Sequence, residues 1–318
     1  MKTTKLTLAL AGLLIAGGAI VSSCKKSTTT PTPAQDTNAS TASDNNMAEQ
    51  HSNDVENIGA EAVDNGSLST FRLANGGLSV ASTNTYNVTG FGTGNVTVTF
   101  YSYTGADGHT RNGSINYTIT GGTHYRDIGM TITVSTSTLN PYTVDNNTVT
   151  ISKTIYNDGL VAAGGNMQWT INTNLSIAKA SGGTFTWNTN NRTHVLLNTN
   201  ATTYDGTAYA AAYNGAATPI TWGNTATSGP LNGAIIQIDG TATGTSADGV
   251  AYSVTTSGVV RNHNCTPFPG RLHFHPFVAG TITFTPGNKT PRIINYGNGA
   301  CDTTYTISIG SWSITITW

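Results

Sequence analysis

Alternation of apolar and polar residues is the feature that most limits how this chain can fold. From residue 67 to residue 318, short segments carry an apolar residue at every second position, as at 95–100, 128–134, 149–155, 282–284 and 312–318. A period of two places the apolar residues on one face of a strand, and one-sided sheets are typical of antiparallel pairing. We therefore expect an all-β antiparallel domain over 67–318, built as a sandwich or as an extended pair of sheets.

Asp-Gly pairs predict where the strands turn. This pair favours a tight hairpin because glycine adopts a positive φ without steric cost. It accounts for five of the eight aspartates in 67–318 and occurs at Asp107-Gly108, Asp158-Gly159, Asp205-Gly206, Asp239-Gly240 and Asp248-Gly249. The aspartates that this pattern leaves over are Asp127, Asp145 and Asp302.

Residues 1–23 predict a lipoprotein signal peptide. Lys2 and Lys5 precede an apolar run, 6–21, that is shorter than the roughly 20 residues of a membrane-spanning helix. The run ends at Val21-Ser22-Ser23-Cys24, which resembles a lipobox. We expect cleavage before Cys24 and acylation of its thiol, which anchors the chain in the outer membrane; the sequence leaves open which side the domain faces. An ordinary secretory signal is the alternative.

Two short segments are expected between the anchor and the β domain. The lipidated cysteine and a disordered tether occupy 24–52, because Ser, Thr, Pro and Asn offer little to bury. A short helix and a connector follow at 53–66, where Asn53 and Glu56 form a capping-box pattern and Val55, Ile58 and Ala62 share one helical face.

Cysteine and charge bound the chemistry of the domain. With Cys24 acylated, Cys265 and Cys301 remain, and an even pair in an exported chain predicts a disulfide, with two buried thiols as the alternative. The formal net charge is −1, and no cluster of Lys and Arg occurs. Nucleic acid is therefore not an expected partner, whereas the membrane is, through the lipid.

Three segments carry a family resemblance. They lie at 106–115, 125–129 and 294–302. With the polar segment and helix before the domain, they make the chain similar to uncharacterised β-rich lipoproteins of Bacteroidota-type gram-negative bacteria. The resemblance implies export and a β architecture, and it transfers no functional residues.

Histidines supply the one candidate metal site. His273 and His275 share a face of one predicted strand, and His263 lies close to the Cys265 linkage, so three imidazoles can meet at one zinc ion. Histidines that simply face solvent are the alternative interpretation.

No catalytic constellation is predicted. The glutamates, Glu49, Glu56 and Glu61, all precede the β domain, and a carboxylate pair would need Asp127 and Asp302. Hydrolase and nucleotide-binding motifs are missing from the sequence.

Aromatic residues suggest a binding surface. The tryptophans and the many tyrosines offer flat faces for sugars among Asn and Thr, although most are equally explained as core; the tryptophans are Trp169, Trp187, Trp222, Trp312 and Trp318. The favoured hypothesis is a non-enzymatic, lipid-anchored cell-envelope protein that binds glycans or partner proteins and has no cofactor. The alternative is a metal-binding or hydrolytic envelope protein that uses His263, His273 and His275.

Overall fold

The described part of the chain is one helix and one sheet. The computed structural model describes residues 39–66, 68, 85–105, 108–125, 127–160, 166–197, 235–262, 277–302 and 304–317. They all belong to one compact unit, Asp36–Trp318. Within these ranges the chain forms helix α1 (Ser40–Asn65) and 14 strands.

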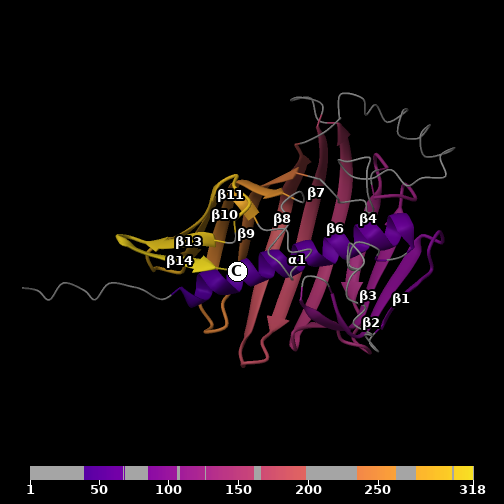
Figure 1. Ribbon diagram of the computed structural model, residues 1–318, viewed down its shortest axis with the longest axis horizontal. Coiled ribbons are helices and arrows are strands. Elements are labelled where there is room, and N and C mark those ends of the chain that lie inside the picture. Colours follow the sequence, from indigo (N-terminus) through magenta and orange to yellow (C-terminus); the bar gives the residue numbers. More distant parts are fainter. Residues whose placement is uncertain are drawn as a thin grey trace, which may run out of the picture. The chain divides into compact units, whose positions relative to one another are not determined.

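The strands follow one another across a single antiparallel sheet, so that neighbours in the chain are neighbours in the sheet (Figure 1). Only the short β5 lies off this path, where it pairs with β3 and β6. The strands are β1 (Thr85–Thr89), β2 (Asn95–Thr104), β3 (Thr110–Thr120), β4 (Thr131–Thr136), β5 (Thr143–Val144), β6 (Asn147–Leu160), β7 (Met167–Ala178), β8 (Thr184–Leu196), β9 (Ile235–Thr245), β10 (Ala251–Asn262), β11 (Phe277–Pro286), β12 (Arg292–Asn298), β13 (Thr304–Ile309) and β14 (Trp312–Thr317).

The all-β antiparallel prediction is confirmed. Buried and exposed residues alternate along β7 and β10, as a period of two requires. The described strands form one sheet, and α1, not a second sheet, packs on its apolar face. We call the face that packs on α1 the inner face and the opposite one the outer face.

Two of the predicted turns are wrong. Asp158-Gly159 lies inside β6 and Asp239-Gly240 inside β9, next to irregularities in strand register. Gly159, with φ 83°, lies at a bulge of β6, which has one residue more than β7 between paired positions. Gly240, with φ 135°, continues β9 opposite extra residues of the neighbouring strands β8 and β10. Asp248-Gly249 does separate β9 from β10, as predicted.

Helix α1 begins earlier than the sequence predicts. It starts at Ser40, so the last 13 residues of the segment expected to be a disordered tether, 40–52, are helical instead. Eleven of its 26 residues are Asn, Asp or Ser, which compete with helical hydrogen bonding, and Ala39 at its start provides no side-chain cap. Most of its side chains are nevertheless buried, so contacts with the sheet stabilise a helix that its own residues favour only weakly.

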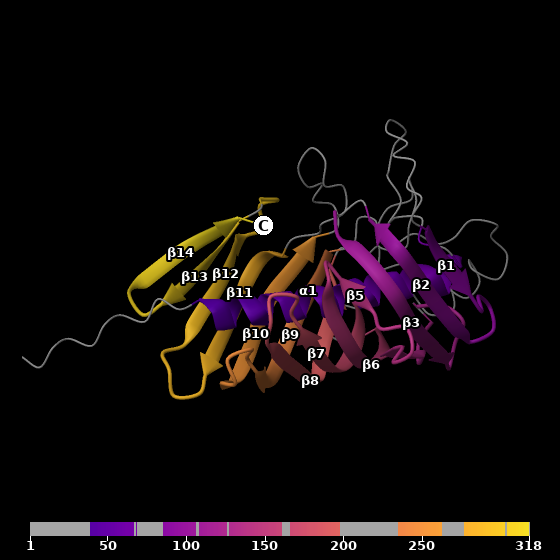
Figure 2. The same ribbon diagram turned by 90° about the horizontal axis from the view of Figure 1, so that it is seen from below.

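The sheet curves around α1 (Figure 2). Successive residues lie about 100° apart around a helix, so three in a row cover roughly 200° of its circumference. Three such residues reach three separate parts of the sheet: Asp44 reaches Lys179 after β7, Asn45 reaches Trp187 in β8, and Asn46 reaches Tyr296 in β12. At ~1.5 Å per residue α1 is ~39 Å long, enough to cross about eight strands at ~4.8 Å each.

Gly59 lies where α1 approaches β3 most closely. A Cβ atom at this position would lie 2.4 Å from Cε1 of Tyr117, and the Tyr117 hydroxyl donates to the Val55 carbonyl at 2.9 Å, which holds the ring in place. We expect Gly59→Ala to lower the free energy of unfolding by about 1–3 kcal/mol, as overpacking does.

Denaturant titration measures this effect, with the half-buried neighbour Asn57 as the control. Asn57→Ala should change stability by less than about 0.5 kcal/mol or raise it slightly. In an exposed helix Gly→Ala stabilises by about 1 kcal/mol, so a gain at Gly59 would contradict the close contact.

Among the described residues, no helix combines the length and the apolar character that crossing a membrane requires.

Candidate functional site

A buried cluster of charged and polar side chains joins α1 to the inner face. Its centre is Glu56. One carboxylate oxygen, Oε2, accepts from Lys153 Nζ at 2.7 Å, and the other, Oε1, accepts from the Tyr125 hydroxyl at 2.6 Å. His194 Nδ1 lies 3.2 Å from Oε1, and Lys153 Nζ also donates to the Ser52 carbonyl at 2.9 Å. All the ionisable side chains of this Glu56 cluster are almost fully buried.

The electrostatics of the Glu56 cluster keep this carboxyl group ionised. Burial by itself would raise the pKa of Glu56, but the charge of Lys153, helped by His194, holds it well below its ordinary value. Burial lowers the pKa of Lys153 and of His194, and Glu56 opposes both shifts. Burial, with the nearby Glu56 charge, raises the pKa of Tyr125 well above its ordinary value. A carboxylate held by so many donors is a weak base, so the arrangement favours stability over proton transfer.

Further ion pairs extend along α1. Glu49 Oε1 accepts from Arg192 at 2.7 Å, and both side chains are 2% exposed. Burial raises the pKa of Glu49, while Arg192 opposes that shift. Asp54 receives two hydrogen bonds, at 3.0 and 2.8 Å, from Arg111 of β3, a paired geometry that fixes the helix in register.

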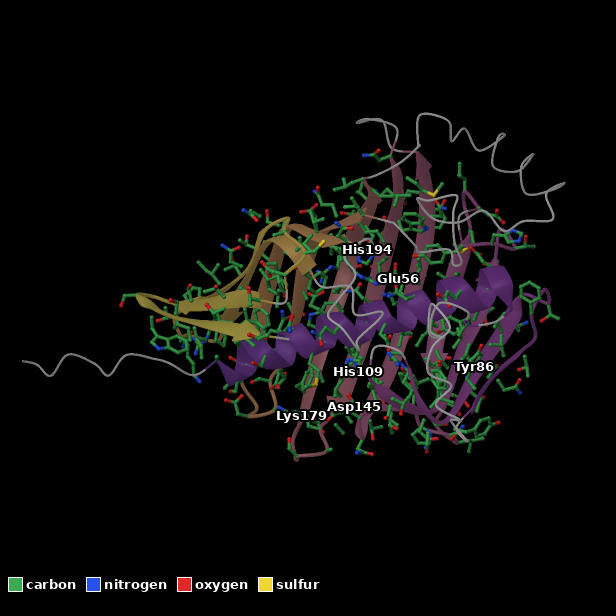
Figure 3. All side chains as sticks on the ribbon, viewed as in Figure 1. Glu56, Tyr86, His109, Asp145, Lys179 and His194 are labelled. Carbon is green, nitrogen blue, oxygen red and sulfur yellow. The ribbon has the colours of Figure 1, made fainter. Side chains whose placement is uncertain are left out.

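His51 lies on the same helix between charged groups of both signs. Its pKa falls to about 4, because burial disfavours the charged ring; Asp54 and Asp145 oppose that shift, whereas His109 and Arg111 add to it. His109 Nδ1 lies 2.6 Å from Asp145 Oδ2. In the view of Figure 3, this pair lies on the opposite side of α1 from the labelled Glu56 and His194.

The pair at Asp145 is itself well anchored. Burial would raise the pKa of Asp145, but the backbone N–H of Thr110, which donates at 2.8 Å, and the His109 ring leave it below its ordinary value. The carboxylate therefore fixes the start of β3 to the turn before β6.

The sequence contained a signal for the Glu56 cluster. Lys153 lies between Ile151 and Ile155, at a position where the alternation predicts a buried apolar residue. Arg111 and Arg192 are also buried. A buried cation needs an anion beside it. The β domain held no glutamate to fill that role, because the partners come from the segment predicted to be tether and helix.

The outer face is polar and uncharged over most of its width. One row runs directly from strand to strand across nine strands, and all its members carry hydroxyl or amide groups: Thr97, Asn116, Ser135, Ser152, Asn174, Asn188, Thr243, Ser253 and Thr285. At ~4.8 Å per strand the row is ~38 Å long. In the described parts of β2 to β11, every Lys and Arg is buried on the inner face.

A second outer row contains an exposed aromatic ring. Tyr156 of β6, 43% exposed, faces Thr170 of β7, which faces Thr193 of β8, which faces Asp239 of β9. We call these residues, with Asp158 and Gln168, the β6–β9 patch.

Irregularities in strand register accompany both aspartates of the β6–β9 patch, in β6 itself at Asp158 and in β8 and β10 beside Asp239. Asp158 Oδ2 accepts from Thr170 Oγ1 at 2.8 Å and from Gln168 Nε2 at 3.1 Å. Asp239 Oδ1 accepts from the backbone N–H of Gly258 at 2.6 Å. Sequence reasoning missed this patch because it assigned both aspartates to hairpin turns.

The two aspartates that a catalytic carboxylate pair would need do not meet. Asp127 lies between β3 and β4 and Asp302 between β12 and β13, and six strands, β6 to β11, separate β4 from β12 in the sheet. Asp127 accepts from the backbone N–H of Thr123 at 2.7 Å. Burial would raise the pKa of Asp127, but His124 and the N–H donors leave it below its ordinary value. Asp302 accepts from the N–H of Thr304 at 2.9 Å.

Several predicted site residues lie outside the described residues, so the lipidation, the disulfide and the histidine metal site stay predictions. They are Cys24, Cys265, His263, His273 and His275. Cys301 follows β12 and is exposed. Within the described ranges, no three His, Cys, Asp or Glu side chains gather in a way that could hold a metal ion.

Two of the three tryptophans within the described residues lie in the core. Trp169 and Trp187 are each 1% exposed on the inner face, so neither offers a face for stacking. Trp312 in β14 is half-buried, and Trp222 and Trp318 lie outside the described residues. The exposed rings on the outer face are tyrosines, Tyr101 and Tyr156, instead of the tryptophans that the sequence suggested.

Comparison with known proteins adds no assignment to either surface. The resemblance to Bacteroidota-type lipoproteins stays a prediction, and function has to be inferred from the chemistry of the inner and outer faces. No family model, no curated protein and no solved structure matches this chain.

Proposed function

We propose that this chain is a lipid-anchored cell-envelope protein, without enzymatic activity, that binds uncharged glycans through the outer face of its sheet. The observation that carries the proposal is the β6–β9 patch, where the exposed Tyr156 ring lies beside Thr170 and the Asp158 carboxylate. A sugar presents hydroxyl groups around a ring with apolar faces. An aromatic ring bordered by hydroxyl, amide and carboxylate groups complements both features.

The charge of the outer face supports a neutral ligand. The carboxylates of Asp158 and Asp239 are the charged groups of the patch, and no described Lys or Arg of β2 to β11 accompanies them on this face. An acidic polysaccharide would meet no cation there, whereas the hydroxyls of a neutral one can donate to both carboxylates.

The outer face is less suited to a protein partner. The fully buried centre of a protein interface is usually apolar and aromatic. The long row of the outer face instead consists of Thr, Ser and Asn side chains, for example Thr97, Ser152 and Asn188. A glycan is therefore the better fit of the two ligand classes expected from the sequence.

The early start of α1 shortens the segment between the expected anchor and the helix. Lys25 to Ala39 comprise fifteen residues, which reach at most about 50 Å when fully extended. This is shorter than the tether predicted up to residue 52. With the lipid on Cys24, the domain would act on glycans close to the membrane surface.

Tyr156→Ala tests the proposal. We expect the purified full-length protein to bind neutral polysaccharides on a glycan array, with little dependence on salt. Truncating Tyr156 should weaken that binding about tenfold, as loss of a central aromatic contact does.

The matched control is Tyr101→Ala. Tyr101 is also exposed, at 53%, but lies in β2, away from the patch, so binding should be unchanged. Equal losses of glycan binding in Tyr156→Ala and Tyr101→Ala would overturn the proposal. Binding of acidic glycans without binding of neutral ones would overturn it as well.

A further inference from the structure

Strand β14 forms one edge of the described sheet. Among the described strands it pairs with β13 alone. Its six residues, Trp-Ser-Ile-Thr-Ile-Thr, include no charge, no proline and no glycine. Natural edge strands usually carry charged residues or proline because these block pairing with another chain. β14 has none of these protections.

The inner side of β14 is apolar and incompletely covered. Ile314 faces Ile307 of β13, which is fully buried, yet Ile314 itself is 41% exposed. Trp312 and Ile316 lie on the same side, and each is half-buried. The strand therefore ends the sheet with a strip of apolar side chains that the described residues leave partly open.

The sequence of β14 reads nearly the same in both directions. Around Thr315, the order Ser313-Ile314-Thr315-Ile316-Thr317 places isoleucine on both sides and a small hydroxyl residue beyond each. In an antiparallel pair of two such strands with Thr315 facing Thr315, Ile314 faces Ile316 and Ser313 faces Thr317. Apolar residues then meet on the inner face and hydroxyls meet on the outer face.

We propose that β14 pairs with β14 of a second copy of this chain, across a two-fold axis at Thr315. An axis perpendicular to the sheet keeps both inner faces on the same side, so the two sheets join into one. The lack of charge means that no like charges face each other across the axis. Six residues on each side make a small interface, so we expect a weak dimer. The proposal is independent of glycan binding.

A single cysteine at the axis detects this pairing. Directly opposed residues in an antiparallel pair have Cα atoms about 4.5–5.5 Å apart, within the range of a disulfide. Full-length Thr315→Cys should therefore form a covalent dimer on mild oxidation. Mass spectrometry should find its C-terminal peptide joined to itself, above the background that the native cysteines of the wild type give.

Ser313→Cys is the matched control. In the proposed register two copies of residue 313 lie four positions apart along the strands, about 14 Å, which is too far for a disulfide. This variant should not form the covalent dimer, whereas Ser313→Cys combined with Thr317→Cys should cross-link.

A non-covalent measurement gives a second readout. Thr315→Lys places two like charges at the axis and should weaken self-association in sedimentation at least about tenfold. Thr255→Lys, at an exposed position of β10 inside the sheet, should leave it unchanged.

Three outcomes would overturn the proposal. They are the absence of a Thr315→Cys dimer at any protein concentration, cross-linking of Ser313→Cys as efficiently as Thr315→Cys, and cross-linking of Thr315→Cys only with Asn87→Cys of β1. The last result would mean that opposite edges of two sheets meet and form an open chain.

Discussion

Replacing Glu56 with alanine will lower the free energy of unfolding by about 3–5 kcal/mol, the usual effect of removing one partner of a buried ion pair. The lysine left behind, Lys153, is 1% exposed and would remain in the core without its carboxylate. The Tyr125 hydroxyl and the His194 ring lose the same acceptor. Because three groups depend on one carboxylate, this substitution should have the largest effect of those considered.

Thermal and denaturant unfolding measure the loss, which corresponds to a melting temperature lower by on the order of 10 °C. Asp302→Ala is the control, since Asp302 is exposed and accepts a hydrogen bond from Thr304 in its own turn. This substitution should change the free energy of unfolding by less than about 0.5 kcal/mol. Combining Glu56→Leu with Lys153→Met should restore much of the stability, because no buried charge is then left alone. A cost below about 1 kcal/mol for Glu56→Ala would contradict the role assigned to the cluster.

Replacing His51 with glutamine will reduce, by about 3 kcal/mol, the amount of unfolding free energy that the protein loses between pH 6.5 and about pH 4. The folded protein holds the pKa of His51 at about 4, against an ordinary value of 6.5. Between these two values the unfolded chain binds a proton that the folded chain does not, so stability falls as the pH is lowered from 6.5 to about 4. A shift of about 2.5 units corresponds to roughly 3 kcal/mol.

The measurement is the difference in unfolding free energy between wild type and His51→Gln across this pH range. Glu49 and Glu56 also titrate with shifted pKa values, in opposite directions, but they are present in both proteins and cancel in the difference. Asn53→Ala, which removes a buried side chain of the same helix without a titrating group, should displace the stability curve and keep its slope. A constant difference between wild type and His51→Gln from pH 7 to 4 would show that His51 is not buried as a neutral ring.

Helix α1 is rich in polar residues, but its buried carboxylates lie against cations of the sheet: Glu56 with Lys153, Glu49 with Arg192, and Asp54 with Arg111. Charge pairing in the interior tolerates little displacement, since each ion must keep its partner. Helix α1 is therefore an integral part of the fold.

Strand formation could be predicted from the sequence because its signal is local. The alternation at 95–100 and 149–155 became β2 and β6, since a period of two determines which side chains share a face. The Asp-Gly pairs show the limit of local reasoning. Asp248-Gly249 forms a turn, whereas Asp158-Gly159 forms a bulge in β6 and Asp239-Gly240 continues β9 opposite bulges of its neighbours. Only the neighbouring strands distinguish these outcomes.

The candidate sites could be predicted far less well. Tyr156, Thr170 and Asp239 come from three strands and meet only because the register of β6 to β9 aligns them. Glu56 and Lys153 are 97 positions apart in the chain. No pattern within a short window contains either arrangement.

The sequence by itself determined the class of this protein: antiparallel strands with one apolar face, which follow from the alternation of side chains along an extended backbone. The tertiary structure alone decided that residues 40–52 are helical and that their acidic side chains lie in the core. The physical reason is that a buried Lys153 or Arg192 stabilises a nearby carboxylate strongly, and this interaction, absent from an isolated segment, outweighs the weak helical preference of Asn, Asp and Ser.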